Sequence, residues 1–197
     1  MKNILVFLSV IALISMSSCK KDSSSSSSAT GLDNKDMVYA IFIAGMSWDT
    51  QTKALKSSVP INISVDNTVK GPEGGNINVL GSVTGSMNID DKTGAIINGT
   101  MLLGLTETIN AYAFKSNGQT YTMNGAPYIS LSGTFTLLSG GTTFGTASGM
   151  QIGGGVRVTG PGYDQTVNIN LTININSNGT GGDVSGTIGG VSVNYKF

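Results

Sequence analysis

The sequence contains no histidine, and its only glutamates are Glu73 and Glu107. The absence of histidine excludes the Ser-His and Cys-His arrangements that activate a nucleophile, and it excludes metal sites built on imidazole. Either glutamate could pair with an aspartate to hydrolyse a glycoside, but Glu73 lies in Gly71-Pro72-Glu73-Gly74-Gly75, which is typical of a solvated turn. Asp90-Asp91 opens another turn, where the two carboxylates could bind calcium loosely, although adjacent acidic residues in a turn usually serve only as solvated turn residues. We therefore predict no catalytic residue, no metal site, no cofactor and no enzymatic activity.

Charged residues are also scarce, at 11% of the chain, with 11 basic and 11 acidic residues. A nucleic-acid-binding surface requires a basic stripe with interleaved aromatic residues. Aromatic residues make up only 7% of this sequence, and Trp48 is its single tryptophan. We expect no nucleic-acid partner.

Cysteine occurs once, so disulfide bonds within the chain are excluded, and Cys19 stands at the end of an apolar leader. Lys2 gives this leader a positive start, residues 4–14 are almost all apolar, and residues 15–18 are mostly small and polar. The apolar run is too short to cross a membrane, which needs about 20 residues. These features predict a cleaved signal peptide over residues 1–18.

Met16-Ser17-Ser18-Cys19 resembles the lipobox of bacterial lipoproteins, and Lys20-Lys21-Asp22 resembles the start of mature lipoproteins of the Bacteroidota type. The resemblance implies that the thiol of Cys19 is acylated and that Cys19 becomes the new N-terminus. It also implies a protein anchored by lipid in the outer membrane or displayed on the cell surface. The partner expected from this motif is the membrane itself.

Residues 19–36 follow the leader and include six consecutive serines at positions 23–28. Such a stretch has too little apolar surface to offset the entropy lost on ordering, so we interpret it as a flexible tether. Residues 37–197 remain, enough for one domain with its own core.

Apolar and polar residues alternate with a period of two along this domain, as in half-buried strands. We predict an all-β, antiparallel up-and-down meander of about ten strands. The predicted strands lie near residues 38–46, 59–65, 77–89, 96–105, 109–114, 119–123, 129–138, 142–158, 166–175 and 184–197, the last being a hairpin. A turn at Glu107-Thr108 would be weak, so one long bent strand is the alternative there.

Short turns containing glycine fix the pairing of these strands, because a slip of one residue moves every side chain to the other face. The predicted turns are Asn117-Gly118, Gly140-Gly141, Pro161-Gly162, Asn178-Gly179 and Gly189-Gly190. The predicted pairs are Phe114 with Tyr121, Tyr112 with Met123, Leu137 with Phe144, Leu131 with Met150, Ile129 with Ile152, Val156 with Val167, Ile173 with Val184, Ile169 with Ile188, Ile188 with Val191 and Val184 with Tyr195. Gly153-Gly154-Gly155 is expected to form a bulge that shifts the buried face.

Periodicity alone leaves open whether the meander closes into a barrel or packs as a sandwich, and which of its faces meets water. Residues 191–197, which alternate and end in Phe197, resemble the C-terminal signature of outer-membrane barrels. The alternatives are thus a soluble domain and a small membrane barrel with a polar lumen.

Two ligand classes fit this sequence. Trp48 and Tyr39 could stack on a sugar, with rows of Asn and Thr bonding its hydroxyls; alternatively, Trp48 packs at the end of the domain and the rows face water. In a lipocalin-like barrel, inward glycines would leave room for a small apolar ligand, and the candidates are Gly81, Gly85, Gly99 and Gly133. We predict a lipid-anchored, non-enzymatic structural or binding module.

Overall fold

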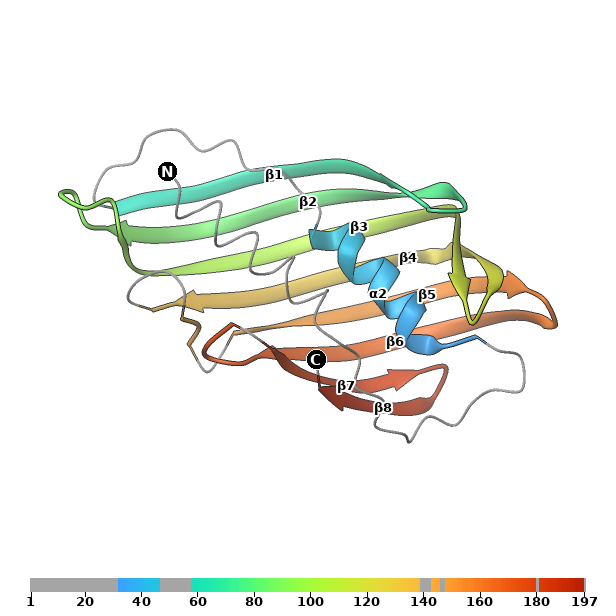
Figure 1. Cartoon of the computed structure of the whole chain (residues 1–197). Helices are drawn as coiled ribbons and strands as arrows, with labels where there is room; N and C mark the ends of the chain where they lie inside the picture. The colour runs from blue at the N-terminus through green and yellow to red at the C-terminus, as the bar shows by residue number, and fades with distance from the viewer. Residues whose placement is uncertain (1–31, 47–57, 139–142, 146–147, 180, 197) are drawn as a thin grey trace.

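The computed structural model describes residues 32–46, 58–138, 143–145, 148–179 and 181–196 (Figure 1). The elements within these residues are one helix and eight strands: α2 (Asn34–Met46), β1 (Ser58–Lys70), β2 (Gly74–Ile89), β3 (Ile96–Ser116), β4 (Gln119–Leu137), β5 (Gly149–Gly160), β6 (Tyr163–Ile175), β7 (Gly182–Ile188) and β8 (Val191–Lys196). The strands form one antiparallel sheet in chain order from β1 to β8. The all-β, up-and-down meander predicted from alternation is confirmed.

This sheet is open, because β1 pairs only with β2 and β8 only with β7 among the described strands. Neither the closed barrel nor the sandwich is confirmed, since the strands make a single sheet with free ends. Figure 1 shows the strands side by side, with α2 lying across one face. We call the face that carries α2 the inner face and the opposite one the outer face.

The predicted number of ten strands is not confirmed, because β3 and β4 each replace two predicted strands. No turn forms at Glu107-Thr108, so the long-strand alternative is correct there. Pairing with β2 runs without interruption from Asn110 to Asn98, and this continuous ladder carries β3 through the segment. Next to Ala111, whose φ is 48°, the register shifts toward both neighbouring strands: between Asn110 and Ala113 in the pairing with β2, and between Glu107 and Tyr112 in the pairing with β4.

The strand predicted at residues 38–46 is wrong, because these residues belong to α2. An apolar run of this length does not by itself distinguish a strand from a buried helix. Asp33 provides the missing signal: its carboxylate accepts a hydrogen bond from the Lys35 N–H at 2.9 Å, as a helix N-cap does. Asp36 adds an acidic residue to the first turn, which favours the helix dipole.

Most predicted registers are confirmed, including Phe114 with Tyr121 and Ile173 with Val184. The exception is the pairing of β4 with β5. Leu137 does face Phe144, but Leu131 pairs with Ile152 rather than Met150, so the register is shifted by two residues. Ile129 accordingly pairs with Gly154 rather than Ile152. The shift preserves which face is buried, because side chains alternate with a period of two.

The bulge expected at Gly153-Gly154-Gly155 is absent from the β5–β6 ladder, which is continuous through these residues. The irregularity lies on the facing strand, between Gly125 and Ile129 of β4. As a result β5 keeps one face throughout, with Ile152 and Val156 both buried on the inner side.

The inner face forms the hydrophobic core, to which every strand from β1 to β7 contributes a buried apolar side chain; examples are Val65, Ile77, Leu105, Leu131, Ile152, Leu171 and Val184. Burying one such side chain contributes about 1.5–3 kcal/mol. Met37, Ile41 and Ala44 of α2 belong to the same core. The outer face therefore remains the surface on which a site open to solvent can be built.

Candidate functional site

Two of the residues singled out by sequence, Cys19 and Trp48, lie outside the described residues. The third, Tyr39, lies on α2 and is 49% exposed. Tyr39 lies on the inner side of the sheet, near Tyr112. Burial is the main cause that raises the pKa of Tyr112, and electrostatic interactions with Glu107 and Tyr39 raise it further. Tyr39 therefore lies on the opposite side of the sheet from the polar rows that were expected to act with it.

The outer face carries these polar rows. One row contains a residue from each strand, in the order β1 to β8, and we call it the central polar row: Ser64, Ser82, Gly104, Ser132, Gln151, Thr172, Ser185 and Asn194. Each member is the direct cross-strand partner of the next. The row therefore crosses the sheet at right angles to the strands, and no member is charged.

The two neighbouring rows are similarly uncharged over the middle strands. From β2 to β6 one reads Thr84, Leu102, Thr134, Gly149 and Asn174, and the other reads Leu80, Thr106, Ser130, Gly153 and Asn170. Ion pairs on this side of the sheet lie toward the strand ends and the β7–β8 edge: Arg157–Asp164 at 2.9 Å, Lys115–Glu73 at 3.1 Å and Lys196–Asp183 at 3.7 Å. The centre of the outer face is a neutral, hydrogen-bonding surface.

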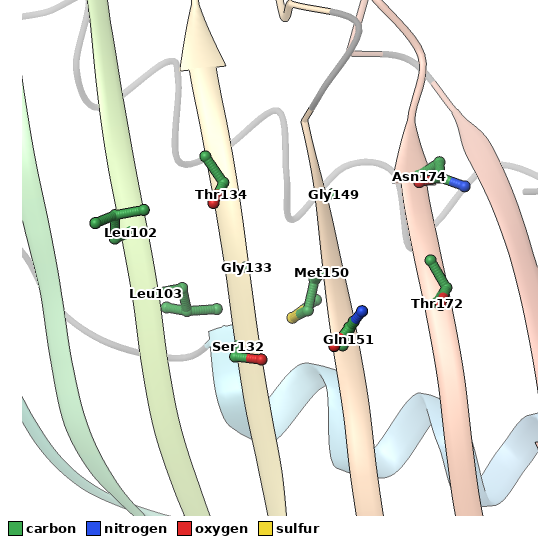
Figure 2. Close-up of a pocket in the computed structure, with 10 residues that line it drawn as sticks. All are labelled: Leu102, Leu103, Ser132, Gly133, Thr134, Gly149, Met150, Gln151, Thr172 and Asn174. Atoms are coloured by element: carbon green, nitrogen blue, oxygen red, sulfur yellow. The ribbon is translucent and has the colours of Figure 1, made fainter.

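A hollow of about 430 Å³ opens in this surface across β3 to β6. Figure 2 shows its lining residues, which are Leu102, Leu103, Ser132, Gly133, Thr134, Gly149, Met150, Gln151, Thr172 and Asn174. Gly133 and Gly149 lie on the adjacent strands β4 and β5, and a Cβ at either position would lie 2.6 Å from a carbonyl oxygen of the neighbouring strand. The inner-face residues Leu103 and Met150 contribute to the floor, so the hollow has polar walls and a partly apolar base.

The hollow presents several hydrogen-bonding groups that the protein itself does not use. Within the described residues, the side chains of Ser132, Gln151 and Thr172 take part in no hydrogen bond, in contrast to Ser130, which donates to the Gly153 carbonyl oxygen at 3.1 Å. Hydroxyls both donate and accept, and so does the Gln151 amide. Leu102 adds an apolar surface, because its side chain is 49% exposed at the rim.

The four glycines expected to leave room for an apolar ligand do not do so. A Cβ at Gly81 or Gly85 would overlap the carbonyl oxygen of Gly104 or Thr100, and a Cβ at Gly99 or Gly133 would lie 2.8 Å from the Ser86 oxygen or 2.6 Å from the Gly149 oxygen. Gly81 and Gly85 also have φ of 150°, which favours glycine. The space is thus taken by neighbouring backbone, which is the reason that these two positions hold glycine.

Glu107 was predicted only as a possible member of a carboxylate pair or of a weak turn, and the structure gives it a different environment. Its side chain is 0% exposed, and neither carboxylate oxygen has a hydrogen-bond partner within the described residues. Its direct neighbours on the inner face are Val79 and Ile129, both fully buried. A Cβ on Gly45 of α2 would lie 2.9 Å from Glu107 Oε1, so the helix closes over the carboxyl group.

Burial raises the pKa of Glu107 from 4.5 to about 9, and the nearby Gly45 backbone N–H lowers it by less. The group is therefore a neutral acid at pH 7, sealed from solvent beneath a helix. A carboxyl group without access to solvent or substrate is not placed for catalysis. The burial was not predicted, because Glu107 was placed in a weak turn; the signal that could have found it is that Glu107 continues the inward series of Leu103 and Leu105.

The described residues contain no cluster of three or more potential metal ligands. The acidic turn at Asp90 is closed by its own backbone, since Asp90 Oδ1 accepts hydrogen bonds from the N–H groups of Lys92 at 2.9 Å and Thr93 at 2.8 Å. These bonds, with that from the Thr93 side chain, lower the pKa of Asp90.

Among the described residues, no helix is long and apolar enough to span a membrane. Comparisons of the chain with protein-family models, with curated proteins and with solved structures gave no match. The outer face and its hollow are therefore interpreted from their own chemistry.

Proposed function

We propose that this protein is a lipid-anchored, non-enzymatic binding module of the outer membrane or cell surface, and that it binds its ligand on the outer face of the sheet. The anchor is supported by the apolar leader and the Met16-Ser17-Ser18-Cys19 motif. Two or more acyl chains on one residue hold a protein at a membrane stably, whereas a single chain does so only marginally.

The observation that carries the binding role is the neutral outer face with its hollow. Protein surfaces usually intersperse charged residues of both signs, which keep the protein soluble and separate. Here Ser132, Gln151 and Thr172 instead place unused hydrogen-bonding groups around a depression of about 430 Å³. A ligand that contributes several hydroxyl or amide groups would satisfy these side chains without burying a charge.

A steric block of the outer face tests this role. Gly104 lies in the central polar row next to Ser132, and a Cβ added there meets no atom within 4 Å, so Gly104→Trp covers the face without displacing the fold. Thr120→Trp is the matched control, because Thr120 is an exposed residue of β4 roughly 40 Å along the strand from Ser132.

Both variants and the wild type are compared for retention of components from solubilised cell envelope and for binding on a glycan microarray. We expect Gly104→Trp to lose what the wild type binds and Thr120→Trp to keep it. Equal binding by all three proteins would show that the outer face is not the binding surface.

A further inference from the structure

The geometry of the central polar row allows the ligand class to be specified. Neighbouring strands lie about 4.8 Å apart, so consecutive members of the row repeat at that interval. This repeat is close to the length that one pyranose adds to an extended glycan. A glycan laid across the strands would therefore meet one strand with each successive sugar.

We propose that the central polar row binds a neutral, extended glycan that runs at right angles to the strands, with one sugar over each strand from β3 to β7. This inference rests on the proposed function of the outer face. The row offers each sugar one group: open backbone at Gly104, the Ser132 hydroxyl, the Gln151 amide, the Thr172 hydroxyl and the Ser185 hydroxyl.

The chemistry of the row and its neighbours fits a sugar chain at several points. A sugar hydroxyl donates and accepts at once, and so do the hydroxyls of Ser132 and Thr172 that bond to nothing else within the described residues. Leu102 lies on β3, two residues before Gly104, where its exposed side chain can contact the apolar C–H face of a ring. The hollow of about 430 Å³ beside the row has room for a ring substituent.

Other ligand classes fit these residues less well. Nucleic acids and acidic polysaccharides require Lys or Arg, and the central polar row contains neither over the eight strands. Protein interfaces concentrate Tyr, Trp, Met and Arg at their centres, whereas this row consists of Ser, Thr, Asn, Gln and Gly. An apolar ligand would leave the groups of Ser132, Gln151 and Thr172 unsatisfied.

A length series tests the direction and the class together. Binding of the full-length protein to glucose, mannose and N-acetylglucosamine oligomers of one to eight units is measured by calorimetry, with oligogalacturonates of equal length as acidic counterparts. For one neutral series we expect affinity to rise with each added sugar up to about five units, the number of strands from β3 to β7, and then to level off.

Three variants locate the binding. Gly104→Trp is expected to weaken binding of the five-unit glycan at least tenfold, and Thr120→Trp to leave it unchanged. Gln151→Ala, which removes the central amide without adding bulk, is expected to weaken binding of five-unit glycans while leaving that of two-unit glycans nearly unaffected. Circular dichroism and thermal melting verify that each variant is folded.

The outcomes separate this inference from the proposed function. Binding of an acidic glycan or a protein that Gly104→Trp abolishes would retain the outer face as a binding surface but overturn the neutral glycan. Affinity that does not depend on glycan length would overturn the cross-strand placement, and failure of every neutral series would overturn the inference itself. If Gly104→Trp alters nothing that the wild type binds, the proposed function fails as well.

Discussion

The buried carboxyl of Glu107 makes the stability of this protein depend on pH in a predictable direction. In the unfolded chain a glutamate loses its proton near its ordinary pKa of 4.5, whereas burial in the folded protein raises the pKa of Glu107 to about 9. Between these values the unfolded chain holds fewer protons than the folded one. The free energy of unfolding is therefore greatest below pH 4.5 and falls as the pH rises toward 9.

The size of the effect follows from the separation of the two pKa values. Each pH unit in this window costs about 1.4 kcal/mol, so wild-type stability should fall by about 4 kcal/mol between pH 5 and pH 8. The chain has no histidine, which leaves this range almost free of other side-chain titrations. The pKa shifts of Asp90 and Asp164 are downward, and those of Tyr112 and Tyr163 are upward from 10, so none of them falls in the window.

Urea denaturation of the wild type and of Glu107→Gln at pH 5, 6, 7 and 8 measures this dependence. The glutamine keeps the shape of the side chain but cannot ionise, so its stability should be nearly constant across the series. Glu73→Gln is the control, because Glu73 is the other glutamate and makes only an exposed ion pair with Lys115. It should follow the wild type. A wild-type protein whose stability does not change with pH, or a Glu107→Gln protein with the same slope, would refute the reasoning.

Three further predictions concern the helix, a buried hydroxyl and the anchor. Gly45→Ala should destabilise the packing of α2 by about 1–3 kcal/mol, because the added Cβ would lie 2.5 Å from Leu131 Cδ2. Hydrogen exchange in this variant should be faster in residues 34–46 than in β6, and equal exchange in the two segments would contradict the prediction. Ser148→Ala should cost about 1–3 kcal/mol in thermal unfolding, since the hydroxyl of Ser148 accepts from the Thr136 N–H at 2.9 Å and donates to its carbonyl oxygen at 3.2 Å. Cys19→Ser should abolish incorporation of labelled fatty acid and release the protein from the membrane fraction; a variant that still acquires the label would disprove the lipid anchor.

The fold was largely predictable where local signals decide it. Two-residue turns such as Asn117-Gly118 and Asn178-Gly179 fix the register of their hairpins, and both registers were predicted correctly. The helix α2 was missed because its residues from Met37 onward are apolar on nearly every side, so they show no helical period. Its start depends on the Asp33 cap, which is a single side chain.

Closure of the sheet could not be predicted, because alternation describes each strand and not how the first and last strands meet. The burial of Glu107 was missed, because this residue was assigned to a weak turn. It follows Leu103 and Leu105 at the inward positions of β3, so a period of two continued through the segment is the signal that could have found it. The enclosure of Glu107 by α2 at Gly45 could not be predicted, because no local sequence pattern gives the position of the helix on the sheet.

The candidate site depends on the one register that the sequence analysis placed incorrectly. With the predicted pairing, Gln151 would lie beside Ser130 and Ser132 beside Gly149, so the rows that cross β4 and β5 would consist of different side chains. The observed shift of two residues brings Gln151 opposite Ser132 and Gly149 opposite Thr134, which aligns the central polar row and opens the hollow beside it.

Contacts within the link between β4 and β5 stabilise the observed register of these two strands. Phe144 pairs with Leu137, the Gly145 N–H donates to the Thr136 carbonyl oxygen at 2.8 Å, and Ser148 bonds to both backbone groups of Thr136. The link thus takes up two residues more than a simple turn at Gly140-Gly141 would. Which face of a strand is exposed is set by alternation, but which side chains stand together on that face is set by turn length. Here the buried hydroxyl of Ser148 bonds to both backbone groups of Thr136, which stabilises the longer link and so determines which side chains of β4 and β5 stand together in the site.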